Sequence, residues 1–140
     1  MNLIIALKIV AVLQLSVAVL NLFLTRLLKW QEDLDKMSLL PRQVFNVHSW
    51  FVSIMLVIFG VLTFRFADQM VSGQSEPALW IAAAAGIFWG IRTVIQMVYY
   101  SPSHWWGKTG RTVIHVALLL VYGAMSATYL WPCFSKVSVE

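Results

Sequence analysis

A nearly uninterrupted apolar run from residue 79 to residue 100 constrains this chain more than any other feature. Its only strongly polar side chains are Arg92 and Gln96. The run is long enough to cross a bilayer as a helix, which takes about 20 apolar residues. A guanidinium within hydrocarbon costs at least about 2.5–3.5 kcal/mol on insertion scales. We therefore expect Arg92 to face protein, water or a bound anion rather than lipid tails.

The composition of the whole chain points to the same class of protein. The chain has 140 residues, of which 60% are hydrophobic and only 11% are charged, whereas a soluble domain carries about 25% charged residues. This deficit predicts a single integral membrane domain covering residues 1–140, with the lipid bilayer as its main partner. Cys133 is the only cysteine, which excludes an internal disulfide. No basic run suggests binding to nucleic acid.

Four apolar segments predict an all-α fold. They lie at about residues 3–28, 44–66, 78–100 and 112–130. The first segment exceeds the apolar region of a secretory signal, about 7–15 residues, so we expect it to be retained as a helix. The connections are short and polar, which makes neighbouring helices antiparallel. The sequence therefore predicts a four-helix transmembrane bundle with up-down-up-down topology.

Basic residues near the helix ends predict the orientation of this bundle. Six fall on one side, namely Arg26, Lys29, Lys36, Arg42, Lys108 and Arg111, and three on the other, namely Lys8, Arg65 and Lys136. Because cytoplasmic loops carry an excess of Lys and Arg, both termini should lie outside. In a bacterial inner membrane this would be the periplasmic side.

Polar residues within the apolar segments fall at similar depths. With a rise of about 1.5 Å per residue, most of them lie in the cytoplasmic third of the bilayer. Here we predict a ligand-binding cavity lined by Asn21, Thr25, His48, Arg92, Gln96 and His115, with Tyr99 and Tyr122 on the same helical faces. The structural alternative is that these groups form hydrogen bonds between helices, or that Arg92 extends to the membrane surface.

Two functions are compatible with this cluster. The first is a non-catalytic binding or accessory module, since Arg92 beside a histidine suits a phosphate or carboxylate. The alternative is a redox protein, in which His48 and His115 supply axial ligands to a b-type haem, or the same polar set holds a quinone headgroup. The apolar segments contain no Asp or Glu, which argues against a carboxylate-bridged di-metal centre. No catalytic signature is present.

Small residues mark a packing surface on the third segment. Ala82, Gly86 and Gly90 recur at four-residue spacing, so they share one helical face on which another helix can approach closely. The partner helix could belong to this chain or to a second copy in a homo-oligomer.

Overall fold

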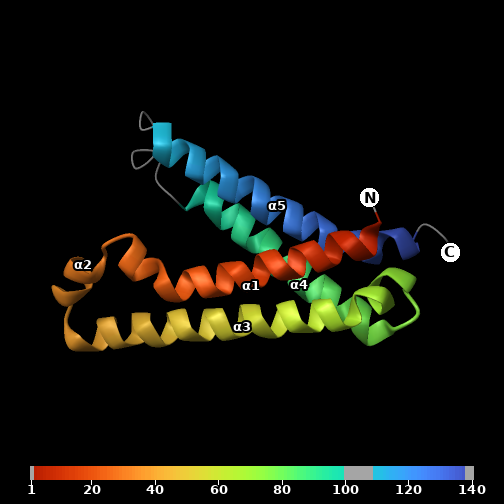
Figure 1. Cartoon of the computed structure of the whole chain (residues 1–140), viewed down its shortest axis with the longest axis horizontal. Helices are drawn as coiled ribbons and strands as arrows, with labels where there is room; N and C mark the ends of the chain where they lie inside the picture. The colour runs from red at the N-terminus through yellow and green to blue at the C-terminus, as the bar shows by residue number, and fades with distance from the viewer. Residues whose placement is uncertain (1, 100–108, 138–140) are drawn as a thin grey trace. The chain divides into compact units, whose positions relative to one another are not determined.

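The computed structural model describes residues 2–99 and 109–137, and side chains within residues 2–99 and 112–135. The described residues form five helices and no strand (Figure 1). These are α1 (Leu3–Leu27), α2 (Gln31–Asp35), α3 (Leu39–Ser72), α4 (Glu76–Val98) and α5 (Thr109–Val137). Tyr100, Lys108 and the side chains of Arg111 and Lys136 lie outside the described residues.

Four of the helices are long and apolar, which confirms the predicted all-α class. Helices α1, α3 and α4, and the segment Thr112–Ser135 of α5, have the length and hydropathy needed to cross a membrane. The remaining helix, α2, lies in the first polar connection and has no buried residue. The apolar pattern did not predict α2, because four of its five residues are polar.

Two of the long helices extend beyond the apolar segments. Helix α3 continues past residue 66 through Asp68 to Ser72, and α5 continues past residue 130 through Pro132 to Val137. Hydropathy detects only the part of a helix that is apolar, whereas the backbone hydrogen bonds that define the helix do not depend on side-chain polarity. A hydropathy pattern therefore underestimates helix length wherever the ends are polar.

The end of α1 is closed by a hydrogen-bonded cap. The backbone N–H of Trp30 donates to the carbonyl of Thr25 at 2.9 Å, and that of Lys29 donates to the carbonyl of Arg26 at 3.2 Å. These are the two bonds of a Schellman motif, which places its turning residue in the left-handed region. Lys29 occupies that position with a φ of 55°, where glycine is the usual residue.

The chain divides into two compact units. The α1–α3 unit comprises Lys8–Arg65, and the α4–α5 unit comprises Met1–Leu7 together with Phe66–Glu140. In the α1–α3 unit the two long helices are antiparallel, because Gln14 contacts Leu56 while Asn21, further along α1, contacts Ser49. They approach closely at Gly60, where an added Cβ would lie 2.9 Å from Leu15 Cδ2.

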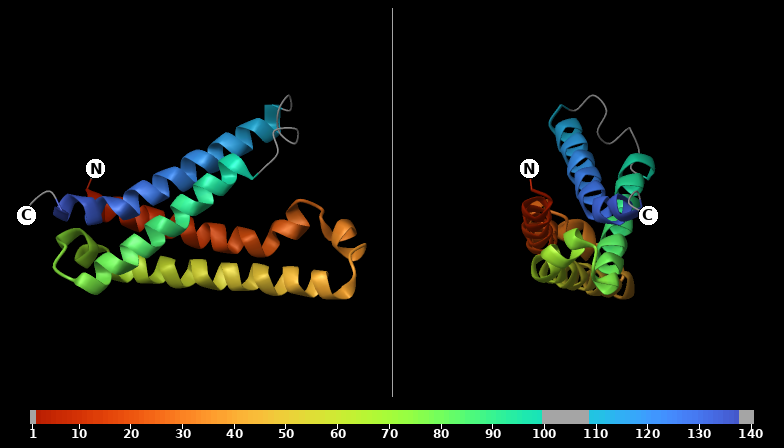
Figure 2. Two further views of the ribbon diagram at one scale, coloured as in Figure 1. Left: turned by 180° about the vertical axis from the view of Figure 1, so that it is seen from behind. Right: turned by 90° about the vertical axis from the view of Figure 1, so that its right-hand side faces the viewer.

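In the α4–α5 unit the two helices run side by side and antiparallel (Figure 2). Gln96 near the end of α4 contacts His115 near the start of α5, while the carbonyl of Leu79 contacts Cys133. Ala82 and Gly86 are buried. A Cβ built on Gly86 would lie only 2.6 Å from Leu130 Cγ. In this structure α5 therefore packs on the small-residue face of α4.

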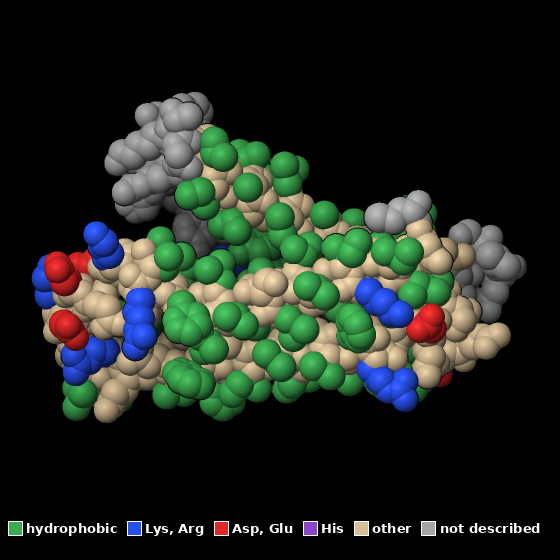
Figure 3. Space-filling model, viewed as in Figure 1, with side chains coloured by type: hydrophobic (Ala, Val, Ile, Leu, Met, Phe, Trp, Pro, Cys, Tyr) green, Lys and Arg blue, Asp and Glu red, His purple; other side chains and the backbone are tan. Residues whose placement is uncertain are grey.

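On the face shown in Figure 3, apolar side chains cover the middle of the α1–α3 unit and charged side chains gather at its two ends. Large side chains such as Phe23 on α1 and Phe51 on α3 are exposed, at 53% and 68%. Soluble monomers rarely expose contiguous apolar patches of more than a few hundred Å². This surface is suited to contact with lipid tails.

Candidate functional site

One face of α4 carries the side chains that meet α5. Trp89, Arg92 and Gln96 follow one another at intervals of three and four residues, which places them on the same side of the helix. Their neighbours on α5 include His115 and Tyr122, which are seven residues apart and so also share a face. The two helices thus bring four of the predicted site residues together: Arg92, Gln96, His115 and Tyr122.

Arg92 lies over an aromatic stack. Its Cζ atom is 5.2 Å from the centre of the Tyr122 ring. On α4, the ring of Trp89 stacks with Tyr122, with 5.2 Å between centroids and 28° between planes. Both aromatic rings are buried, and Arg92 is half-buried. A guanidinium over an aromatic face gains about 0.5–1 kcal/mol when exposed and about 2 kcal/mol when desolvated. The stack therefore helps to hold a cation at this depth in an apolar helix pair.

Gln96 and His115 form a hydrogen bond between the two helices. Gln96 Nε2 donates to His115 Nδ1 at 3.0 Å. Nδ1 can accept this bond in the tautomer that carries its proton on Nε2. The amide of Gln96 is only half satisfied, because its Oε1 atom is buried and has no hydrogen-bond partner among the described residues. A buried acceptor in this state costs about 1–3 kcal/mol, which a donor from a ligand or a water molecule would recover.

The opposite half of the same helix pair is packed tightly and fixes its register. Ser126 Oγ on α5 donates to the carbonyl of Gly86 at 2.8 Å. At Gly90, an added Cβ would lie 3.1 Å from the same hydroxyl. Leu130 covers Gly86 one turn further along α5. This half has a structural role, and it sets the positions of the polar groups that lie nearer the end of α4.

The predicted site residues of α1, Asn21 and Thr25, belong to the other unit, where Asn21 bonds to α3. Asn21 Nδ2 donates to the carbonyl of Ser49 at 3.0 Å and to the hydroxyl of Ser53 at 2.9 Å. Gln14, deeper in the unit and fully buried, donates to the carbonyl of Leu56 at 3.0 Å. Thr25 is half-buried one turn beyond Asn21. Asn21 therefore links α1 to α3 as a structural donor.

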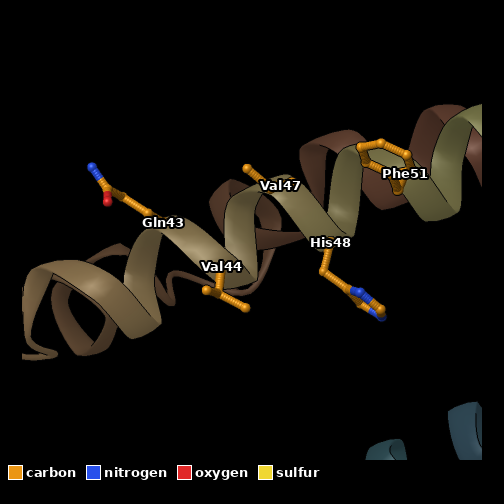
Figure 4. A pocket seen from close by; sticks show the side chains of 5 residues that line it. All are labelled: Gln43, Val44, Val47, His48 and Phe51. Atoms are coloured by element: carbon orange, nitrogen blue, oxygen red, sulfur yellow. The ribbon is translucent and has the colours of Figure 1, made fainter.

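His48 and Tyr99 lie on exposed surfaces. The His48 side chain points away from α3, beside a shallow hollow whose lining residues Gln43, Val44, Val47 and Phe51 all belong to that helix (Figure 4). Tyr99 follows the last residue of α4 and is 82% exposed. His48 is in the α1–α3 unit and His115 in the α4–α5 unit. Among the described residues, no three His, Cys, Asp or Glu side chains are grouped as a metal site.

Trp89 is the site residue that the sequence interpretation missed. It supports the ring on which Arg92 rests, and an edge-on contact with Phe88 at 5.5 Å flanks it on α4. The signal was present in its spacing, since Trp89 precedes Arg92 by three residues and Gln96 by seven. An apolar residue in an apolar segment does not stand out unless the facing helix is known.

Comparison with protein-family models, curated proteins and solved structures finds no match.

Proposed function

We propose that this chain is a small polytopic integral membrane protein that binds an anionic amphiphile without catalysing a reaction. The binding site is the polar end of the α4–α5 unit, formed by Arg92, Gln96, His115 and Tyr122. In this proposal the four apolar helices span the membrane in up-down-up-down order, with both termini outside. The observation that carries the proposal is the half-buried cation of Arg92, one helical turn from the unsatisfied amide oxygen of Gln96.

The position of these groups along α4 suits a headgroup. Gln96 is two residues from the last residue of α4. Arg92 is six residues from it, or about 9 Å at 1.5 Å per residue. From this depth the long side chain of Arg92 can extend toward the headgroup region, where lipid phosphates lie. Stacking on Tyr122 engages the face of the guanidinium, whereas a phosphate is bound by its edge N–H groups. The same arginine can therefore use both interactions.

Lipid retention by the purified full-length protein tests this function. Native mass spectrometry would compare proteins released from nanodiscs of phosphatidylcholine containing a minor fraction of phosphatidylglycerol. We expect the wild type to retain phosphatidylglycerol selectively. We expect Arg92→Gln to reduce retention about 10- to 100-fold, since a charged hydrogen bond contributes about 1.5–3 kcal/mol. Arg65→Gln serves as the control, because Arg65 is exposed on α3.

Three results would contradict the proposal. Equal retention by the wild type and Arg92→Gln would remove Arg92 from any binding site. A Soret band in the purified protein that is abolished by His115→Ala would instead establish the alternative, a b-type haem. Co-purified quinone, identified by mass spectrometry and lost in the same variant, would likewise favour the redox function.

A further inference from the structure

Gln96 imposes a second requirement on the ligand, which is independent of charge. Gln96 is only 5% exposed, and its Oε1 atom is buried with no hydrogen-bond partner among the described residues. The other end of the amide is already used, because Nε2 donates to His115. A carbonyl oxygen can only accept hydrogen bonds. The site therefore lacks a donor, and an anion alone would not supply one.

We propose that the bound headgroup carries a hydroxyl donor next to its phosphate. This inference rests on the proposed function. The phosphate faces Arg92 and the hydroxyl donates to Gln96 Oε1. The two residues are four apart on α4, so they lie one turn apart on the same face. A polyol phosphodiester, as in phosphatidylglycerol, has both groups a few bonds apart. The site thus recognises the hydroxyl group of the headgroup in addition to its negative charge.

Other common headgroups meet this pair of requirements less well. Choline has no O–H or N–H donor. The ammonium of ethanolamine is a donor, but its positive charge is repelled by the guanidinium one turn away. A simple phosphodiester without a hydroxyl satisfies Arg92 and leaves the Gln96 acceptor unpaired. The hydroxyl is therefore the feature that separates the preferred ligand from lipids of equal charge.

Two synthetic lipids that differ in their headgroup hydroxyls would measure the contribution of the hydroxyl to binding. Dioleoylphosphatidylglycerol and dioleoylphosphatidylmethanol have the same acyl chains and the same phosphodiester charge, and only the first has headgroup hydroxyls. Each would be added at a low fraction to phosphatidylcholine nanodiscs containing the full-length protein, and retention would be measured by native mass spectrometry. We expect the wild type to prefer the glycerol lipid about 3- to 10-fold, the usual effect of one neutral hydrogen bond.

Substitution of Gln96 assigns the preference to its acceptor. Gln96→Met keeps the length of the side chain and removes the amide, so we expect both lipids to bind equally and still better than phosphatidylcholine. Gln74→Met is the control, since Gln74 is exposed in the turn before α4, and it should keep the preference. The comparison on the wild type does not depend on the folding of any variant.

The outcomes separate this inference from the function on which it rests. Equal binding of the two anionic lipids by the wild type, both above phosphatidylcholine, would overturn the hydroxyl requirement and leave the anion site intact. A preference that persists in Gln96→Met would also overturn it, because another group would then accept the hydroxyl. Failure of both lipids to bind above phosphatidylcholine would overturn the proposed function itself.

Discussion

Individual polar side chains in this protein make two kinds of hydrogen bond to backbone carbonyls. Some reach the facing helix, as Asn21 does to Ser49 and Ser126 does to Gly86. Others bond back to their own helix four residues earlier, as Ser16 does to Val12. Only the first kind couples helices. In membrane proteins such bonds average about 0.6 kcal/mol and reach about 1.7 kcal/mol.

Replacement of Asn21 by leucine should therefore destabilise the α1–α3 unit by about 0.6–1.7 kcal/mol, because both of its interhelical bonds would be lost. The free energy of unfolding would be measured by titration with sodium dodecyl sulfate in mixed micelles. Ser16→Ala is the matched control, since its hydroxyl bonds only within α1. An equal loss of stability in the two variants would show that the bonds from Asn21 do not couple the helices.

At this scale the sequence predicted which polar residues share a helical face, but not what that face contacts. The shared face of Arg92 and Gln96 follows from their spacing. The contact of Gln96 with His115 depends on how α5 is rotated about its axis relative to α4. The apolar pattern of the sequence does not specify this rotation. His48 illustrates the same limit. The face of α3 with Ser49 and Ser53 is turned toward Asn21, and His48, about 100° away from Ser49 around the helix, is left exposed.

At the scale of the helices, small residues decide how closely α4 and α5 can approach. Gly86 lies against Leu130, with no room for a methyl group. Gly123 on α5 has far more space, since a Cβ there would meet only Thr93 Cγ2, at 3.9 Å. Both glycines lie within apolar segments of the sequence, yet they have different roles. Only the packing of the two helices distinguishes these roles.

Gly86→Ala should destabilise the α4–α5 unit by about 1–3 kcal/mol, the usual cost of overpacking. Gly123→Ala should be neutral or stabilising by up to about 1 kcal/mol, because alanine is the better helix former. Thermal unfolding in detergent, followed by circular dichroism, would measure both. Adding Leu130→Ala to the Gly86→Ala variant should remove the clash, so that the two changes together cost less than their sum. Strict additivity would contradict this packing.

For the whole molecule, composition and apolar length were sufficient to predict four long apolar helices. They were not sufficient to predict α2 or the polar extensions of α3, because neither is marked by hydropathy. Basic residues near the helix ends add a prediction about orientation in the membrane. Arg26, Lys29, Lys36 and Arg42 flank the first connection, so that connection is expected in the cytoplasm.

Cysteine labelling would test this orientation. In a Cys133→Ala background, Ser38→Cys reports on the first connection and Ser75→Cys on the turn before α4. A membrane-impermeant maleimide applied to intact cells should modify Ser75→Cys alone, and Ser38→Cys should react only after permeabilisation. The reverse pattern would mean that the termini are cytoplasmic.

The acceptors used by Gln14 and Asn21 have an evolutionary implication. Both amides donate to main-chain oxygens of α3, at Leu56 and Ser49, and every amino acid offers that oxygen. Exchanging Leu56 for another apolar residue would leave its acceptor in place, whereas exchanging Gln14 would eliminate the donor. Selection to keep these two helices joined should accordingly act on the amides at 14 and 21 and on the hydroxyl at 53, which also accepts from Asn21, whereas the side chains at 49 and 56 can drift in homologous chains.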